Sequence, residues 1–175
     1  MKKQKDAIEI SILVVMVVFA VISRSIFAFT PHFKPVSAIV VITGIWLGAK
    51  NGFVCGALAA LISNFLFGQG LWTPFQMMAW GLIGLFAGLF SRALVKNKFL
   101  LILYGVLAGI FYSLILDIAT VLLMDRYFNL SRYIVVLASS LPVMAVYAVS
   151  NALFLMVLAT PIGRKLERVK MKYGF

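Results

Sequence analysis

Residues 36–67 read VSAIVVITGIWLGAKNGFVCGALAALISNFLF, an apolar run interrupted by a single charged residue, Lys50. The tripeptide Lys50-Asn51-Gly52 in its middle is a turn signal. We therefore predict one helix over 36–49 and a second over 52–67. The alternative is one long helix that carries Lys50 at its centre, and the choice between the two fixes the fold.

The composition around this stretch excludes a soluble globular domain. Hydrophobic residues make up 63% of the 175 residues and charged residues 12%, whereas a soluble domain carries about 25% charged residues. A helix needs roughly 20 apolar residues to cross a bilayer. The chain therefore supplies five or six spans, and no room remains for a soluble catalytic or nucleotide-binding domain.

Outside the central stretch, prolines mark further helix boundaries. A first helix should end at Thr30-Pro31, because proline disfavours helix in the residue before it. A later helix carries Pro74 in its first turn, where proline is accepted, and we expect Pro142 to kink the last helix. The remaining predicted helices cover 8–29, 74–95, 99–124 and 133–160, and a basic tail follows at 163–175.

Counting the basic residues decides between five and six spans. With six spans, 12 basic residues fall on one side, three fall on the other, and Arg24 lies within a span. Five spans would destroy this asymmetry, so the positive-inside rule favours six spans with both termini in the cytoplasm. The 12 are Lys2, Lys3, Lys5, Lys50, Arg92, Lys96, Lys98, Arg164, Lys165, Arg168, Lys170 and Lys172, and the three are Lys34, Arg126 and Arg132.

We thus predict an all-α membrane protein, a six-helix transmembrane bundle that forms one domain over 1–175. The net charge of +11 is explained by cationic cytoplasmic loops rather than by nucleic-acid binding. Small residues recur every four positions in this bundle, a spacing that lets helix backbones approach closely in lipid. They are Gly44, Gly48, Gly52, Gly56 and Ala60, Gly84 and Gly88, Gly105 and Gly109, and Ala148 and Ala152.

Such small residues either pack the bundle or form a flat face that docks another membrane protein. The docking interpretation gains weight on the first helix, where Ala20 and Ala28 flank Arg24 at helical spacing. Arg24 and Asp117 are charges within spans, which are costly in lipid. We expect the two either to pair with each other or to point into an outward-facing ligand cavity.

The densest polar feature is the loop between the third and fourth helices, residues 63–76. Glycines on both sides of Gln69 allow an unusual backbone path, while Trp72 and Gln76 add an aromatic face and an amide. An interfacial aromatic belt would account for Trp72 alone. It does not account for Gly68-Gln69-Gly70 or Gln76, so we favour a binding loop on the outer side.

No catalytic signature accompanies these residues. The sequence has no zinc-protease, nucleophile-elbow or phosphate-loop motif, and His32 and Cys55 are the only histidine and cysteine. We therefore expect no catalytic residues, no metal site and no cofactor. An intramembrane enzyme is the disfavoured alternative.

Two stretches resemble the substrate-binding S component of energy-coupling factor (ECF) vitamin transporters. They are Pro31-His32-Phe33-Lys34-Pro35-Val36-Ser37-Ala38 and Asn64-Phe65-Leu66-Phe67-Gly68-Gln69-Gly70-Leu71-Trp72-Thr73-Pro74-Phe75-Gln76. The resemblance implies a multi-pass protein of a prokaryotic cell membrane that captures a vitamin from outside. It further implies docking on a membrane coupling subunit carried by two cytoplasmic ATPases. Many members dock through Ala-x-x-x-Ala on the first helix, whereas here Arg24 follows Ala20, so the docking surface is expected to include Ala20, Arg24 and Ala28.

By position, the ligand site should lie in the outer half of the bundle. A mostly aromatic cavity with a few polar groups suits a vitamin-sized ligand. The Gly-Gln-Gly-x-Trp-Thr-Pro branch looks similar to members assigned to cobalamin, and riboflavin is the nearest alternative; an accessory membrane protein without transport function is a further one. The predicted site residues are Asn64, Gln69, Trp72, Gln76, Trp80, Tyr112, Asp117, Tyr147 and Asn151.

Overall fold

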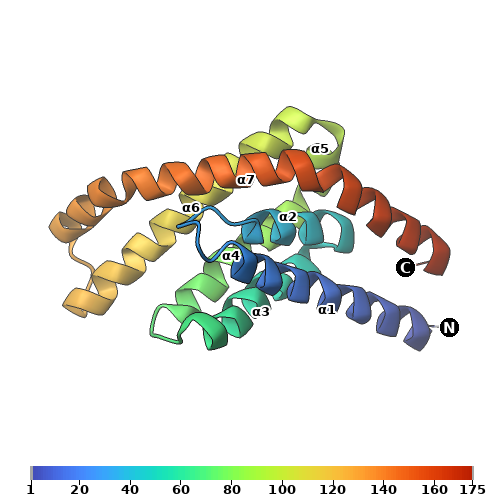
Figure 1. Ribbon diagram of the computed structural model, residues 1–175, viewed down its shortest axis with the longest axis horizontal. Helices are drawn as coiled ribbons and strands as arrows, with labels where there is room; N and C mark the ends of the chain where they lie inside the picture. The colour runs from blue at the N-terminus through green and yellow to red at the C-terminus, as the bar shows by residue number, and fades with distance from the viewer. Residues whose placement is uncertain (1, 175) are drawn as a thin grey trace.

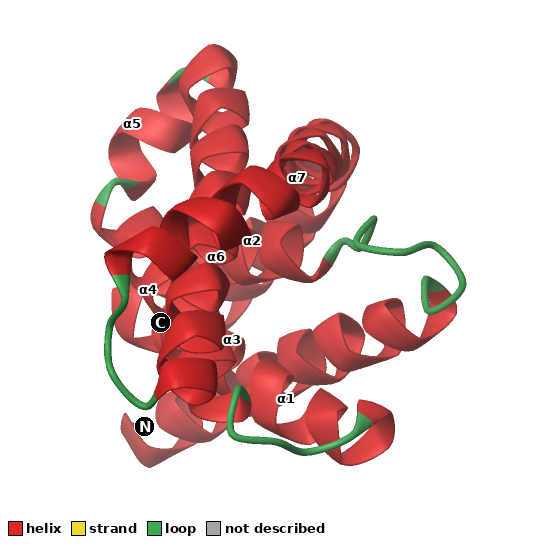
Figure 2. Ribbon diagram, turned by 90° about the vertical axis from the view of Figure 1, so that its left-hand side faces the viewer, coloured by secondary structure: helices red, strands yellow, loops and turns green. Residues whose placement is uncertain are grey.

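The computed structural model describes residues 2–174, which form seven helices joined by short connections (Figures 1 and 2). No strand occurs within this range. The helices are α1 (Lys2–Ile26), α2 (Val36–Leu47), α3 (Ala49–Phe67), α4 (Thr73–Leu89), α5 (Ser91–Lys96), α6 (Lys98–Asp125) and α7 (Leu130–Tyr173).

Four of these helices, α1, α3, α6 and α7, are long and apolar enough to cross a membrane. Two further apolar helices are shorter, with 12 residues in α2 and 17 in α4. The predicted class, an all-α membrane protein, is therefore confirmed.

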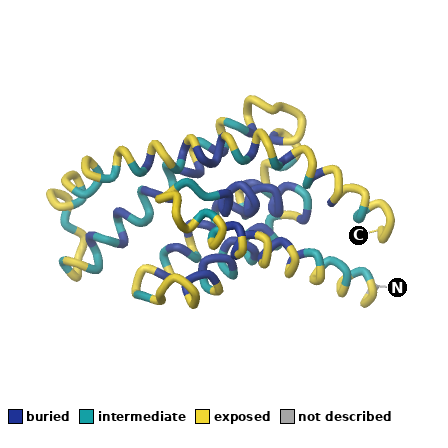
Figure 3. Tube along the Cα trace, viewed as in Figure 1, coloured by how far each residue is buried: buried dark blue, intermediate teal, exposed yellow. Residues whose placement is uncertain are grey.

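Helix α2 lies at the centre of the bundle and contacts each of the other six helices. All its residues except Trp46 are buried, and Ile39, Val40, Val41 and Ile42 are fully enclosed. Figure 3 shows the same concentration of buried chain along α2 and the helix faces turned toward it. A helix that is apolar on every side is expected to be surrounded by protein or lipid, and here protein surrounds it.

The boundary between α2 and α3 lies at Gly48, so the predicted turn at Lys50-Asn51-Gly52 is wrong by two to four residues. Gly48 has a φ of 95°, a conformation that only glycine adopts without a steric cost. Asn51 instead lies in the first turn of α3 and donates a hydrogen bond from Nδ2 to the Leu47 carbonyl, at 2.8 Å. It thereby satisfies an otherwise unpaired carbonyl at the end of α2.

Other predicted boundaries are also corrected. The predicted helix over 74–95 is broken at Phe90 into α4 and α5, and α1 ends at Ile26 rather than at residue 29. The predicted tail at 163–175 is helical to Tyr173, because α7 continues through Pro142 and Pro161. The sequence contains no glycine or proline between Gly163 and Tyr173 that would stop it.

The small-residue spacing packs the bundle, as one of the two interpretations predicts. A Cβ atom added to Gly52 would collide with the Gly84 carbonyl oxygen, and one added to Gly56 with the Trp80 carbonyl oxygen. A Cβ atom added to Gly109 would likewise collide with the backbone of Ala148 on α7. These backbone contacts join α3 to α4 and α6 to α7, the two most extensive helix pairings.

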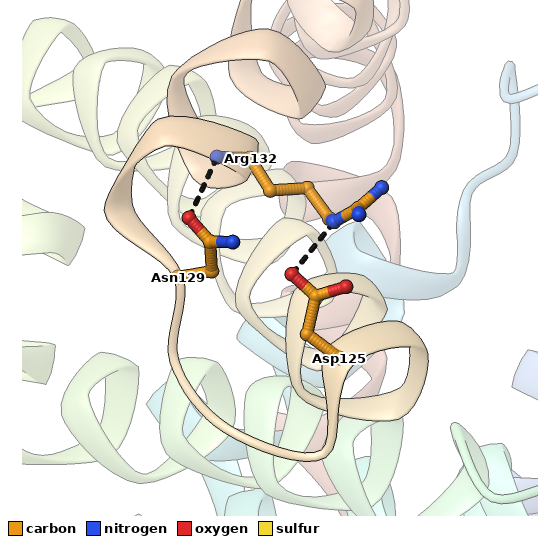
Figure 4. Close-up of polar contacts among 3 residues, drawn as sticks. All are labelled: Asp125, Asn129 and Arg132. Atoms are coloured by element: carbon orange, nitrogen blue, oxygen red, sulfur yellow. Dashed lines mark hydrogen bonds and ion pairs between the residues drawn. The ribbon is translucent and has the colours of Figure 1, made fainter.

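The two termini lie at the same end of the molecule, and the α6–α7 connection lies at the opposite end (Figure 1). That connection is fixed by a polar cluster (Figure 4): Arg132 Nε forms an ion pair with Asp125 Oδ2 at 2.7 Å, and Asn129 Oδ1 accepts from the Arg132 backbone N–H at 3.2 Å. Asn129 is thus the N-cap of α7.

Candidate ligand-binding site

A cavity of about 310 Å³ lies where α1, the 27–35 connection, α2, α4, α6 and α7 meet. It combines an aromatic wall with several polar side chains, as small-molecule sites usually do. Its lining residues are Arg24, His32, Lys34, Val36, Ser37, Gln76, Trp80, Tyr112, Leu116 and Tyr147.

Three aromatic rings form one wall of the cavity. The rings of Trp80 and Tyr112 stack with centroids 5.1 Å apart and planes 14° apart, and Tyr147 meets Tyr112 edge-on at 5.1 Å. Trp80 Nε1 donates to Ser37 Oγ at 3.2 Å, which fixes the indole against the first turn of α2. The wall therefore joins α2, α4, α6 and α7 into one preformed surface.

Behind the cavity, Asn64 holds two of its lining side chains in place. Asn64 is fully buried; its Oδ1 accepts from Arg24 Nη1 at 2.8 Å, and its Nδ2 donates to Gln76 Oε1 at 2.8 Å. The same Nδ2 donates to Thr73 Oγ1 at 2.9 Å, and Arg24 Nη1 also donates to Ser63 Oγ. One amide thus links α1, α3 and α4 and orients the polar groups that face the ligand space.

The 27–35 connection contributes His32 and Lys34 and is itself anchored to α7. His32 Nδ1 lies 2.9 Å from the Tyr147 hydroxyl, and Ser150 Oγ both accepts from the Lys34 backbone N–H at 3.0 Å and donates to the Lys34 carbonyl at 3.2 Å. Burial lowers the pKa of His32, and Lys34 lowers it further. Burial likewise lowers the pKa of Lys34, with Arg24 as the second cause.

The structure brings five of the predicted site residues together. Gln76, Trp80, Tyr112 and Tyr147 line the cavity, and Asn64 bonds to Gln76 behind it. These side chains come from four helices, α3, α4, α6 and α7, and the bundle brings them together around one space.

The other four predicted site residues lie outside the cavity lining. Gln69 closes its own loop, since Nε2 donates to the Leu61 carbonyl at 3.1 Å, and Trp72 is 45% exposed and lies over Gly70. Asp117 accepts from Ser140 Oγ at 2.6 Å. Asn151 is buried, and its Nδ2 has no hydrogen-bond partner among residues 2–174.

The three residues predicted to dock a partner do not share an exposed helix face. Arg24 lines the cavity, Ala20 is fully buried, and Ala28 lies in the turn that follows α1. Arg24 and Asp117 do not bond to each other either: Arg24 donates to Ser63 and Asn64, and Asp117 accepts from Ser140.

Sequence reasoning assigned none of His32, Lys34, Val36, Ser37 and Leu116 to the site. Leu116 and Val36 are ordinary apolar residues within helices, and nothing distinguishes them before the bundle is assembled. Lys34 carries a usable signal, because it is a cation held between Pro31 and Pro35 at the entrance to the most apolar segment. No group of three or more metal-ligating side chains occurs in the described part of the chain.

A comparison with protein families matches residues 2–168 to the family described as ECF-type riboflavin transporter, S component. Neither the curated proteins nor the solved structures give a match. The match covers nearly the whole chain, including every residue that lines the cavity, and it agrees with the all-helical, membrane-spanning architecture. The chain therefore belongs to the ECF-type riboflavin transporter S-component family.

Proposed function

We propose that this S component captures a flavin, with riboflavin as the parent compound, in the cavity beside Trp80. The observation that carries the proposal is the stacked aromatic wall with polar side chains beside it. The family to which the chain belongs is described as a riboflavin transporter component, which agrees with a flavin ligand. A flat ring system can lie against such a wall, where aromatic contacts add about 0.5–1.5 kcal/mol beyond burial.

The size of the cavity favours a flavin over cobalamin. Its volume of about 310 Å³ lies at the lower end of the range for small-molecule sites, roughly 300–1,000 Å³. Cobalamin is a corrinoid several times larger than riboflavin, and a cavity of this volume would have to widen greatly to enclose it. Both the volume and the family match therefore support the riboflavin alternative over the cobalamin prediction.

The transport role requires the cavity to open toward the outside, so we propose six crossings with both termini in the cytoplasm. The arrangement in Figure 1 supports this, because the termini lie at the end opposite the α6–α7 connection. Cys55 is fully buried, so an introduced cysteine can be labelled without background. An impermeant thiol reagent should label Gln69→Cys on intact cells and Lys170→Cys only after lysis; the reverse pattern would overturn the topology.

The family also suggests the partners, a membrane coupling subunit and two cytoplasmic ATPases in a prokaryotic cell membrane. Uptake against a concentration gradient needs a source of energy. We propose that the ATPases supply this energy and that the chain itself supplies the binding cavity. Co-expression with the coupling subunit and ATPases should yield a complex that survives purification. Recovery of the chain alone under conditions that preserve known ECF complexes would count against this part of the proposal.

The decisive experiment is mass spectrometry of small molecules that co-purify with the protein, followed by titration with a vitamin panel that includes riboflavin and cobalamin. Riboflavin fluorescence should be quenched on binding, and Trp80→Leu should weaken binding by about tenfold through the lost stacking. Trp46→Leu is the matched control, because Trp46 bonds to Glu167 outside this cavity. Chemical conversion of a vitamin would favour an enzyme, and binding of none would favour an accessory protein.

A further inference from the structure

The charge of the cavity is not balanced by the protein. Arg24, His32 and Lys34 are three of its ten lining residues, and none of the ten is acidic. Within residues 2–174 the only ion pair is Arg132–Asp125, at the α6–α7 connection. The cavity therefore presents uncompensated positive charge to whatever enters it.

Arg24 is held in position by neutral groups. Both of its hydrogen bonds come from Nη1, to Ser63 Oγ and Asn64 Oδ1, and no described residue accepts from its Nη2 or Nε. Its guanidinium carbon also lies 5.0 Å from the centre of the Phe67 ring and 5.6 Å from that of Trp80. These contacts orient the guanidinium group of Arg24, yet they leave its Nη2 and Nε donors and its positive charge available to a ligand.

Lys34 converges on the same place. Its Nζ lies 5.9 Å from the centre of the Phe67 ring, so both cations lie near the same aromatic ring. Arg24 is the second cause, after burial, of the lowered pKa of Lys34, which is the expected effect of a like charge nearby. Two cations share the cavity at an electrostatic cost that a bound anion would remove.

We propose that the cavity recognises a negative group on its ligand, a phosphate or a carboxylate, through Arg24 and Lys34. Arginine suits both groups because its planar fork can bind two oxygens at once. This inference rests on the proposed function, because it assumes that the flavin ring of the ligand lies against the aromatic wall. Riboflavin itself is neutral, so the proposal selects its phosphorylated form, FMN, as the tighter ligand.

The test compares pairs of vitamins that differ chiefly in an anionic group, by calorimetry on the purified full-length protein. The pairs are riboflavin and FMN, pyridoxal and its phosphate, and nicotinamide and nicotinate. FMN should bind roughly tenfold to hundredfold more tightly than riboflavin, as expected for a charge-assisted hydrogen bond. Arg24→Gln and Lys34→Gln should each reduce that ratio, and Arg126→Gln, an exposed cation outside the cavity, should not.

The outcomes separate this inference from the proposed function. Equal affinity for the two flavins, unchanged in Arg24→Gln, would overturn the inference and leave the flavin proposal standing. Failure to bind either flavin, with a preference for the anionic member of another pair that Arg24→Gln removes, would overturn the flavin proposal and support the inference. Preference for a neutral member, or no binding of any compound in the panel, would overturn the inference.

Discussion

Replacing Asn64 with leucine would test whether the buried amide organises the cavity. Leucine has a similar size, so the change removes hydrogen bonds with little loss of packing. Asn64 makes three side-chain hydrogen bonds, to Arg24, Thr73 and Gln76. Interhelical bonds of this kind in membrane proteins contribute about 0.6 kcal/mol each. We therefore expect the variant to lose about 2 kcal/mol in its free energy of unfolding.

Ligand affinity should fall as well, because Asn64 positions two side chains that line the cavity. An unpaired buried polar group costs about 1–3 kcal/mol, so the dissociation constant should rise roughly 5- to 150-fold. Unfolding in mixed detergent micelles would measure the first quantity, and calorimetric titration of the ligand identified by mass spectrometry would measure the second.

Asn51 provides a matched control for this variant. It is a partly buried asparagine in the same helix, α3, and its Nδ2 donates to Glu9 and to the Leu47 carbonyl. Neither of these partners lines the cavity, whereas Asn64 bonds to the lining residues Arg24 and Gln76. Asn51→Leu should therefore lose stability and keep wild-type affinity. If Asn64→Leu binds ligand as tightly as the wild type while its stability falls, the network has a structural role only and the reasoning is refuted.

Three further predictions concern packing, the aromatic wall and pH. Gly84→Leu should prevent folding, since even a Cβ there would collide with the Gly52 carbonyl; a monodisperse gel-filtration peak would contradict this. Trp72→Ala should weaken ligand binding less than Trp80→Ala, because only Trp80 lines the cavity, and equal losses by titration would count against the site. The pKa of His32 lies below its ordinary value of 6.5, so on acidification the unfolded chain protonates at this histidine before the folded chain does. Stability should therefore fall as pH drops below 6.5. In His32→Gln the melting temperature should depend less on pH in this range.

Most of the fold follows from local apolar patterning, which located six long segments separated by glycine, proline or charge. The boundaries were less predictable, because several glycines compete for each role. Gly48, Gly52 and Gly56 look alike in the sequence, yet only Gly48 adopts a positive φ, while Gly52 and Gly56 pack against α4. Which glycine ends a helix and which packs against a neighbour depends on where the neighbouring helix lies. The sequence of a single segment does not contain that information.

The candidate site was predictable where chemistry stands out against an apolar background. Gln76 and Trp80 on α4 could be placed near a ligand for that reason, and the structure turns both into the cavity. Gln69 and Trp72 stand out equally, but Gln69 closes its own loop and Trp72 lies over Gly70. Whether such a side chain bonds within its own loop or lines a cavity depends on how the adjoining helix is rotated about its axis. The sequence pattern does not determine this rotation.

The position of α2 has a consequence for assembly. Its 12 residues extend about 18 Å at 1.5 Å per residue, well short of a hydrocarbon core of about 30 Å. Unlike α1, α3, α6 and α7, it is too short to form a stable transmembrane helix before it contacts other helices. It packs against α1, α3, α4 and α7, so we expect it to take its place only as these helices close around it. Because Val36 and Ser37 in its first turn also line the cavity, completing the bundle and creating the binding space are a single event.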